Sequence, residues 1–318
     1  MNLKTIFFGT SDFAVPALKS LINFNYKVLA VITQPEKPMG RTKVVTPSPI
    51  KKVALEANIE TLEPHNLKDD DGFFEKFKDL NPDICIVAAY GKIIPSQYLD
   101  IPKYGFLNIH PSLLPKYRGP SPIQTTIMNG EKETGVTIIK LDTQMDHGPI
   151  IAVREFSIFN FQFSNQKELE HKLANLGTEL LIDVLPKYIN GEIKPKEQDH
   201  LRATFTKMLS RDDGKINWNR SSREIYSQIR ALNPEPGTWT TWNNKIMNIK
   251  RAECLEDESP EKIHLWQIGK VIKIIKKLAV TTASGYLILE TVQLEGKKEM
   301  DIQNFLNGHI GFIGSVLI

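Results

Sequence analysis

Residues 4–33 read KTIFFGTSDFAVPALKSLINFNYKVLAVIT and contain two short apolar runs on either side of a segment with helical spacing. The two runs, KTIFFG and KVLAVIT, are rich in branched and aromatic residues, which favour strands. Between them, FAVPALKSLINF places apolar residues three and four positions apart, as a helix covering a sheet requires. A strand, a helix and a second strand in this order are typical of a parallel α/β unit.

Four further apolar runs of strand length follow, and a long amphipathic segment comes after them near residues 166–189. The runs are ICIVAA, GFLNIH, GVTIIKL and PIIAVREF, and the long segment is QKELEHKLANLGTELLIDVLPKYI. We therefore predict an α/β domain with a mainly parallel sheet over residues 1–189. Sheets of this kind bind ligands outside the carboxyl ends of their strands, so the strand ends are where candidate functional residues are sought.

The pattern changes after the polar segment NGEIKPKEQ, in which Pro195 prevents the long helix from continuing. Shorter strand candidates then follow at close intervals: GTWTTW, KIMNIKRA, VIKIIKK, LAVTTA and YLILETVQL. We assign residues 190–206 to a linker and predict a small, barrel-like all-β domain over residues 207–318.

The composition is that of a globular protein, with 41% hydrophobic and 24% charged residues. Cys85 and Cys254 are far apart and have no Cys or His at ligand spacing, so we expect neither a disulfide framework nor a metal site. No apolar run approaches the roughly 20 residues of a membrane span, and the chain starts directly with a strand pattern. We therefore expect a cytoplasmic protein without a membrane partner.

The stretch FLNIHPSLLPKYRG, residues 106–119, contains the first candidate catalytic residues. Asn108 and His110 alternate along the end of a predicted strand, so their side chains leave the same face. Pro111 and Pro115 stiffen the exit from this strand because each fixes its own φ. A histidine at a strand end is also common as a solvated or capping residue, and the polar Asn108 beside it is what favours a site.

A second polar corner, LDTQMDHGPI, places Asp146 between two apolar runs. An aspartate before a glycine-containing turn also has a purely structural interpretation, because such residues stabilise turns. If this loop brings Asp146 near His110, the carboxylate would favour the protonated imidazole and the two would form an acid–base pair. Asn108 would then stabilise a developing oxyanion, as acyl transfer between two amines requires, with no Ser or Cys nucleophile.

These segments resemble the folate-dependent formyltransferases over nearly the whole chain. The resemblance is carried by GTSDFAVPAL, AAYGKIIP, GFLNIHPSLLPKYRGPSPI and GVTIIKLDTQMDHGPI, in the order of the family's catalytic domain. It implies a Rossmann-like domain with catalysis by Asn108, His110 and Asp146. It also implies 10-formyltetrahydrofolate as co-substrate, with no metal and no permanently bound cofactor. The implied folate-binding residues are Tyr90, Gly91, Ser112, Leu113, Leu114 and Pro115.

Two other stretches resemble the family members that act on a charged tRNA. QPEKPMGRTKVVTPSPIKK, residues 34–52, resembles an insertion loop that contacts the tRNA acceptor end, and Arg41 and Lys43 are the implied contacts. Arginine suits this role because its planar fork pairs with phosphate or stacks on bases. Residues 207–318 resemble an OB-like barrel that binds tRNA. The expected partners are initiator methionyl-tRNA and 10-formyltetrahydrofolate, bound by a monomer.

Charge adds modest support for RNA binding by the second domain. The net charge of +3 is too small to indicate a nucleic-acid partner by itself. Residues 207–318 nevertheless contain 16 Lys and Arg against 13 Asp and Glu, whereas residues 1–206 contain 24 of each kind. Trp239, Trp242 and Lys245 could stack on or pair with RNA, although aromatic residues in a small barrel commonly form its core.

Two other functions stay open. A formyltransferase for a sugar or nucleotide amine would use the same crevice, but it has no evident need for the insertion loop or the barrel. A non-catalytic RNA-binding protein on an enzyme scaffold would not need Asn108, His110 and Asp146 together. We therefore expect an enzyme that formylates the α-amino group of methionyl initiator tRNA for translation initiation.

Overall fold

The computed structural model describes residues 3–36, 38–39, 44–158, 163, 165–256, 267–274 and 276–318, with backbone alone at 38–39 and 44–45. The chain forms two compact units. The N-terminal unit comprises Met1–Pro122, Glu133–Phe159 and Leu169–Thr206, and the C-terminal unit comprises Ile123–Lys132, Asn160–Glu168 and Lys207–Ile318. Arg41 and Lys43 lie outside the described residues.

A seven-stranded sheet forms the centre of the N-terminal unit, in the order β5-β2-β1-β6-β7-β8-β9. The pairs from β5 to β7 are parallel, and β8 and β9 each run antiparallel to the preceding strand. This confirms the mainly parallel sheet, and all six apolar runs of the sequence are strands. The bounds are β1 Lys4–Gly9, β2 Lys27–Ile32, β5 Glu60–Leu62, β6 Ile84–Ala88, β7 Phe106–His110, β8 Glu133–Lys140 and β9 Ile150–Ser157.

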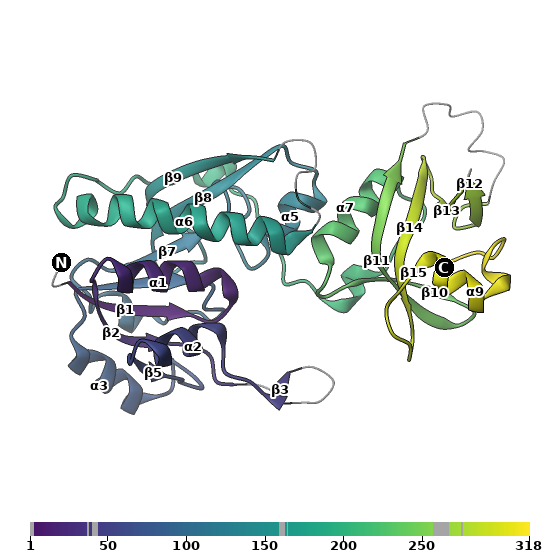
Figure 1. The fold of residues 1–318 in the computed structure, drawn as a ribbon. Helices are drawn as coiled ribbons and strands as arrows, with labels where there is room; N and C mark the ends of the chain where they lie inside the picture. The colour runs from purple at the N-terminus through teal and green to yellow at the C-terminus, as the bar shows by residue number, and fades with distance from the viewer. Residues whose placement is uncertain are drawn as a thin grey trace. The chain divides into compact units, whose positions relative to one another are not determined.

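Helices cover both faces of this sheet. On one face, α1 and α6 lie side by side over the sheet (Figure 1). A Cβ on Gly177 of α6 would lie 2.6 Å from Ile109 Cγ2, so the absence of a side chain lets α6 approach β7 closely. On the opposite face, Phe77 of α3 packs with Phe8 and Phe106. The bounds are α1 Val15–Asn23, α2 Pro49–Glu56, α3 Asp71–Leu80, α4 Ser96–Leu99 and α6 Gln166–Ile189. α5, Pro122–Met128, belongs from Ile123 onward to the C-terminal unit.

The C-terminal unit contains an antiparallel sheet in the order β10-β11-β14-β13-β12, with β15 paired to β14. The predicted barrel-like domain is confirmed, but it is not all-β, because it also contains the helices α7 and α9. One strand candidate also differs from the prediction. VIKIIKK does not form one strand, because Ile274 pairs with Lys277 where β12 turns into β13. The bounds are β10 Thr238–Trp242, β11 Lys245–Leu255, β12 Val271–Ile274, β13 Lys277–Thr281, β14 Tyr286–Leu294, β15 Met300–Asp301, α7 Ser222–Leu232 and α9 Ile302–Gly308.

The last residues of the chain connect the two edge strands of this sheet. The Thr241 N–H donates to Ile318 O at 2.8 Å, and the Ile318 N–H donates back at 3.1 Å, which covers β10. On β12, Val271 N–H donates to Ser315 O and Val271 O accepts from Gly314 N–H, both at 2.8 Å. Because the tail satisfies backbone groups on both edges, it closes the sheet into a barrel-like form.

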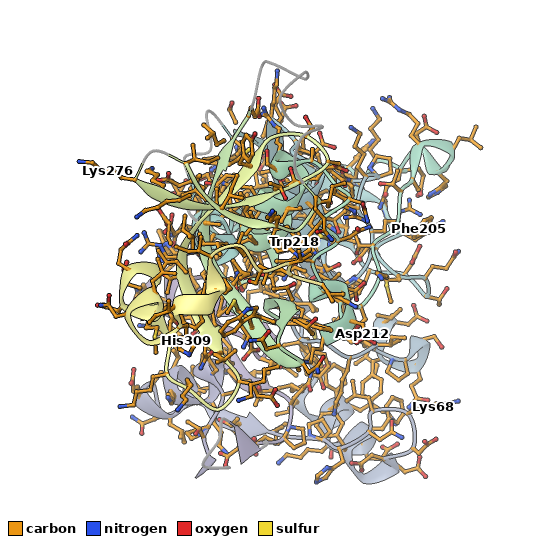
Figure 2. All side chains as sticks on the ribbon, turned by 90° about the vertical axis from the view of Figure 1, so that its right-hand side faces the viewer. Lys68, Phe205, Asp212, Trp218, Lys276 and His309 are labelled. Atoms are coloured by element: carbon orange, nitrogen blue, oxygen red, sulfur yellow. The ribbon has the colours of Figure 1, made fainter. Side chains whose placement is uncertain are left out.

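Aromatic residues make up much of the C-terminal core. Trp218 lies among the packed side chains of this unit, and its indole N–H donates to Thr240 Oγ1 at 3.0 Å (Figure 2). Trp242 is also buried and contacts the rings of Phe305 and Phe312 edge-on. Trp242 is therefore a core residue. Trp239 is half-buried, and its indole N–H donates to Arg211 O at 2.9 Å.

The closing tail provides a matched pair of substitutions. Leu317 is 2% exposed and lies in the C-terminal core, whereas Ile318 is 70% exposed. We expect Leu317→Ala to lower the free energy of unfolding of this unit by about 2–5 kcal/mol, the usual cost of removing a buried leucine. Ile318→Ala should cost under about 0.5 kcal/mol. Chemical denaturation monitored by tryptophan fluorescence measures both, and equal effects would contradict the closure by the tail.

Candidate active site

Asn108 and His110 project from the same face of β7. The strand pleat determines this, because residues two apart point to the same side of a sheet. The register of β7 against β8 places Asn108 opposite Ile139 and His110 opposite Thr137. His110 is 4% exposed and Asn108 is half-buried, so the amide is the more accessible group of the two.

Asp146 reaches both of these side chains from the loop between β8 and β9. Its Oδ1 lies 3.4 Å from Asn108 Nδ2, which donates to it, and 3.6 Å from His110 Nδ1. Its Oδ2 accepts a hydrogen bond from the backbone N–H of Gly119 at 2.8 Å. The structure therefore brings together the three residues that the sequence singles out from separate segments.

The environment of His110 provides an acceptor on each side of the ring. Nε2 lies 3.0 Å from Tyr117 O, and Nδ1 faces the Asp146 carboxylate. Nε2 can therefore donate a hydrogen bond to Tyr117 O, whereas Nδ1 lies at ion-pair distance from Asp146 and just beyond hydrogen-bonding distance. Tyr117 is held in the left-handed region at φ 62°, and its own N–H donates to Thr204 Oγ1 at 2.8 Å.

The corner after β7 is fixed by its own hydrogen bonds. Ser112 is fully buried, and its hydroxyl donates to Lys116 O at 2.7 Å. The Thr137 hydroxyl donates to Ser112 O at 2.7 Å and accepts from Leu114 N–H at 3.1 Å. The Leu114–Pro115 peptide bond is cis. These contacts leave Leu113 and Pro115 as the partly exposed members of the predicted folate-binding corner.

Tyr90 and Gly91, also predicted to bind folate, follow β6. The Tyr90 ring is 2% exposed and packs edge-on against Phe8, and burial raises the pKa of its hydroxyl. Its carbonyl oxygen accepts from Thr10 Oγ1 at 3.0 Å and from Gln34 Nε2 at 2.8 Å. Gly91 has φ 76°, a conformation that favours glycine. Because the Tyr90 ring is buried and Gly91 has no side chain, these two residues could contact a ligand only through their backbone atoms.

The segment assigned to a linker contributes residues beside the site that the sequence analysis missed. Arg118 N–H donates to Thr204 O, and Arg118 O accepts from Thr206 N–H. Gln198 is 5% exposed, and its side-chain amide donates to Asp146 O at 2.9 Å and Gly148 O at 2.8 Å. KEQDH, residues 196–200, has a polar composition that is typical of a linker, so its sequence carries no signal of these contacts.

Other features of the described chain do not provide an alternative site. No group of three His, Cys, Asp or Glu residues in the described ranges is placed to hold a metal ion. A surface groove of about 800 Å³ lies between α1 and α6, lined by residues that include Lys19, Lys172 and Glu179. The groove lies on the face of the sheet that α1 and α6 cover, where α6 approaches Ile109. Asn108 and His110 project to the other side of β7.

Comparison with known proteins shows the family to which the chain belongs. Residues 1–185 match the family model described as formyl transferase, and residues 208–310 match formyl transferase, C-terminal domain. The methionyl-tRNA formyltransferase of Thermodesulfovibrio yellowstonii is 43% identical over 97% of this chain and 96% of its own length. That of a Sulfurihydrogenibium species is 41% identical over 96% of this chain and 97% of its own length.

A solved structure shows the same fold at low identity. The N-formyltransferase of Helicobacter canadensis, in complex with folinic acid and dTDP-3-aminofucose, has a TM-score of 0.66 and 20% identity, covering 94% of this chain and all of that chain. The chain described here belongs to the formyl transferase family, which confirms the resemblance found in the sequence. In the described part of the chain, no helix is long and apolar enough to span a membrane.

Gly148 gives a test of the loop that carries Asp146. A Cβ at this position would lie 1.9 Å from Lys140 O, so an alanine would force the loop away from the end of β8. We expect Gly148→Ala to lower kcat for formyl transfer roughly 100-fold, because displacing a catalytic group by about 1 Å can cost that much. Gly72→Ala in α3, where the new Cβ comes no closer than 3.7 Å to its neighbours, should leave kcat unchanged. Wild-type turnover by Gly148→Ala would show that the loop position is unimportant.

Proposed function

We propose that this protein transfers the formyl group of 10-formyltetrahydrofolate to the α-amino group of methionyl initiator tRNA. The observation that carries the proposal is the convergence of Asn108, His110 and Asp146 within 3.4–3.6 Å in a chain of this family. The substrates are those suggested by relatives named methionyl-tRNA formyltransferase, which match along nearly the whole chain.

Asn108 stabilises the oxyanion of the tetrahedral intermediate. The uncharged amine attacks the formyl carbon, and the carbonyl oxygen acquires negative charge as the new carbon–nitrogen bond forms. The Asn108 amide carries two N–H donors, and only one is directed at Asp146. The second remains for the oxyanion, and a positioned donor of this kind lowers the barrier because it needs no reorganisation.

His110 and Asp146 move the proton that must travel between the two nitrogens. The attacking amine loses a proton, and N10 of the folate gains one as its bond to the formyl carbon breaks. Asp146 faces His110 Nδ1 and is anchored by Gly119 N–H, so it orients the imidazole for proton transfer. The products are formylmethionyl-tRNA and tetrahydrofolate, and no covalent enzyme intermediate is needed.

The insertion loop and the C-terminal domain bind the tRNA in this proposal. Binding the acceptor end at a fixed position converts a bimolecular reaction into an effectively intramolecular one. We assign residues 1–189 to catalysis, residues 34–52 to the tRNA-contacting loop and residues 207–318 to tRNA binding. The enzyme acts as a monomer in the cytoplasm, where initiator tRNA is used for translation. Size measurement in solution tests the monomer.

The catalytic assignment is tested by single substitutions of the three residues. We expect Asn108→Ala to lower kcat roughly 10²–10³-fold, the usual cost of removing one oxyanion donor. His110→Ala and Asp146→Ala should lower kcat by at least as much, because they remove the proton-transfer pair. Formylation of charged initiator tRNA is measured with the melting temperature as a check of folding. Near-normal turnover by a folded variant removes that residue from the mechanism.

The acceptor is tested by competition between substrate classes. We expect the wild-type enzyme to formylate charged initiator tRNA and to leave nucleotide-linked amino sugars unmodified. The sugar amine is the alternative acceptor of greatest interest, because the Helicobacter canadensis structure of the same fold contains dTDP-3-aminofucose. Faster transfer to the sugar than to the tRNA would replace the proposed substrate.

Arg41 separates tRNA binding from folate binding. We expect Arg41→Ala to raise KM for the tRNA roughly tenfold or more, because one phosphate or base contact is lost. The Kd for folate, measured by calorimetry, should stay within about twofold. Lys78→Ala removes one exposed positive charge from α3 and should change neither quantity. An equal loss of tRNA and folate affinity in Arg41→Ala would assign the loop another role.

A further inference from the structure

Asp146 requires support from outside its own loop. Its backbone has φ 50°, in the left-handed region that residues with a side chain rarely adopt. A residue in this conformation persists when the surrounding structure determines it, and such residues are frequent at functional sites. The Oδ2 contact with Gly119 N–H fixes the carboxylate, but it leaves the backbone of the loop to be held by other groups.

Gln198 binds the backbone of this loop on both sides of His147. Its Nε2 donates to Asp146 O at 2.9 Å and to Gly148 O at 2.8 Å, so both amide protons are used. The segment that carries Gln198 is held beside the loop by a β-bridge between Ile150 and Lys196, whose backbones exchange hydrogen bonds of 2.7 and 2.8 Å. A single buried side chain therefore binds the loop backbone at two residues, one of which carries the proposed catalytic carboxylate.

Arg118 fixes the orientation of the Gln198 amide. Its Nε and Nη2 donate to Gln198 Oε1 at 3.2 and 2.7 Å. Arginine has donors only, so it can hold the oxygen of the amide and not its nitrogen, which leaves Nε2 directed at the loop. Arg118 itself is 3% exposed, and burial lowers its pKa, opposed by the charges of Asp146 and Asp142.

His200, two residues after Gln198, connects Arg118 to the same loop through His147. Arg118 Nη2 also donates to His200 Nδ1 at 2.9 Å, and the His200 ring stacks on that of His147 with centroids 4.0 Å apart. His147 in turn donates to Asp142 Oδ2 at 2.6 Å. The loop from Asp142 to Gly148 is thus attached to Arg118 through two separate side chains.

We infer that Arg118 and Gln198 are positioning residues for formyl transfer, which act by holding the Asp146 loop in its catalytic conformation. The inference rests on the proposed function for its kinetic test. Neither residue touches Asn108 or His110 through a hydrogen bond within the described chain, so their effect passes through Asp146.

Gln198→Met is the central variant, because it preserves length and burial but removes every hydrogen bond of the amide. We expect kcat to fall roughly 10- to 100-fold, as a displaced catalytic group predicts. KM for 10-formyltetrahydrofolate and for the tRNA should change by less than about twofold. Gln198→Glu keeps an acceptor for Arg118 and loses both donors, and it should lower kcat to a similar extent. The matched control is Gln144→Met, an exposed side chain in the same loop, with unchanged kcat.

A double-mutant cycle separates positioning from a general loss of structure. In the Asp146→Asn background, Gln198→Met should lower kcat by less than about twofold, because the group that it positions has already lost its charge. A full 10- to 100-fold loss in that background would overturn the inference. So would a Gln198→Met enzyme with wild-type kcat, or one in which KM alone changes.

A crystal structure of Gln198→Met reads the position of the loop without reference to activity. We expect the Asp146 carboxylate to leave the Gly119 N–H and the Asp146 backbone to leave the left-handed region. An unmoved Asp146 overturns the inference, whichever acceptor the enzyme uses. Failure of the wild-type protein to formylate charged tRNA would instead count against the proposed function, and the structural result would still decide the positioning role.

Discussion

The hydrogen bonds of Asp146 are the interactions on which the site depends. One carboxylate oxygen faces the amide of Asn108 and the ring of His110, and the other accepts from Gly119 N–H. A carboxylate anchored on one side can orient an imidazole on the other without rotating away. Asp146 holds a left-handed backbone conformation, and hydrogen bonds from Gly119 and Gln198, elsewhere in the N-terminal unit, bind this residue.

The sheet holds the other two residues of the site in place. β7 lies between the parallel β6 and the antiparallel β8, so Asn108 is fixed by pairing on both sides, with Val87 and Ile139, and His110 by pairing with Thr137 of β8. β8 runs antiparallel to β7 and pairs with it, so the loop between β8 and β9 begins beside β7. This allows the loop to reach residues of β7, which come earlier in the chain. Catalytic side chains on strands are held more firmly than those on loops, and the loop residue here compensates with several hydrogen bonds.

The family defines the chemistry in outline, and the local contacts explain how this chain arranges it. Ser112 and Leu114 are used by the corner after β7 for its own stability, through Lys116 and Thr137. The backbone and the partly exposed side chains of the corner are therefore what the proposed folate site would use. In the C-terminal unit, Trp242 belongs to the core, so a search for tRNA contacts should concentrate on the exposed cations of that unit.

The sequence by itself determined six of the seven strands of the first sheet and the shared face of Asn108 and His110, because apolar periodicity and side-chain alternation are local properties. It did not reveal β5, which is only three residues long. It identified Asp146 as a candidate through the polar corner between two apolar runs, and the family resemblance implied its catalytic role. Tertiary structure alone decided that Asp146 meets Asn108 across 38 residues and that Gln198 meets Arg118 across 80. Such contacts depend on how distant segments pack, and a polar residue that is buried by packing has the same sequence signature as one in solvent.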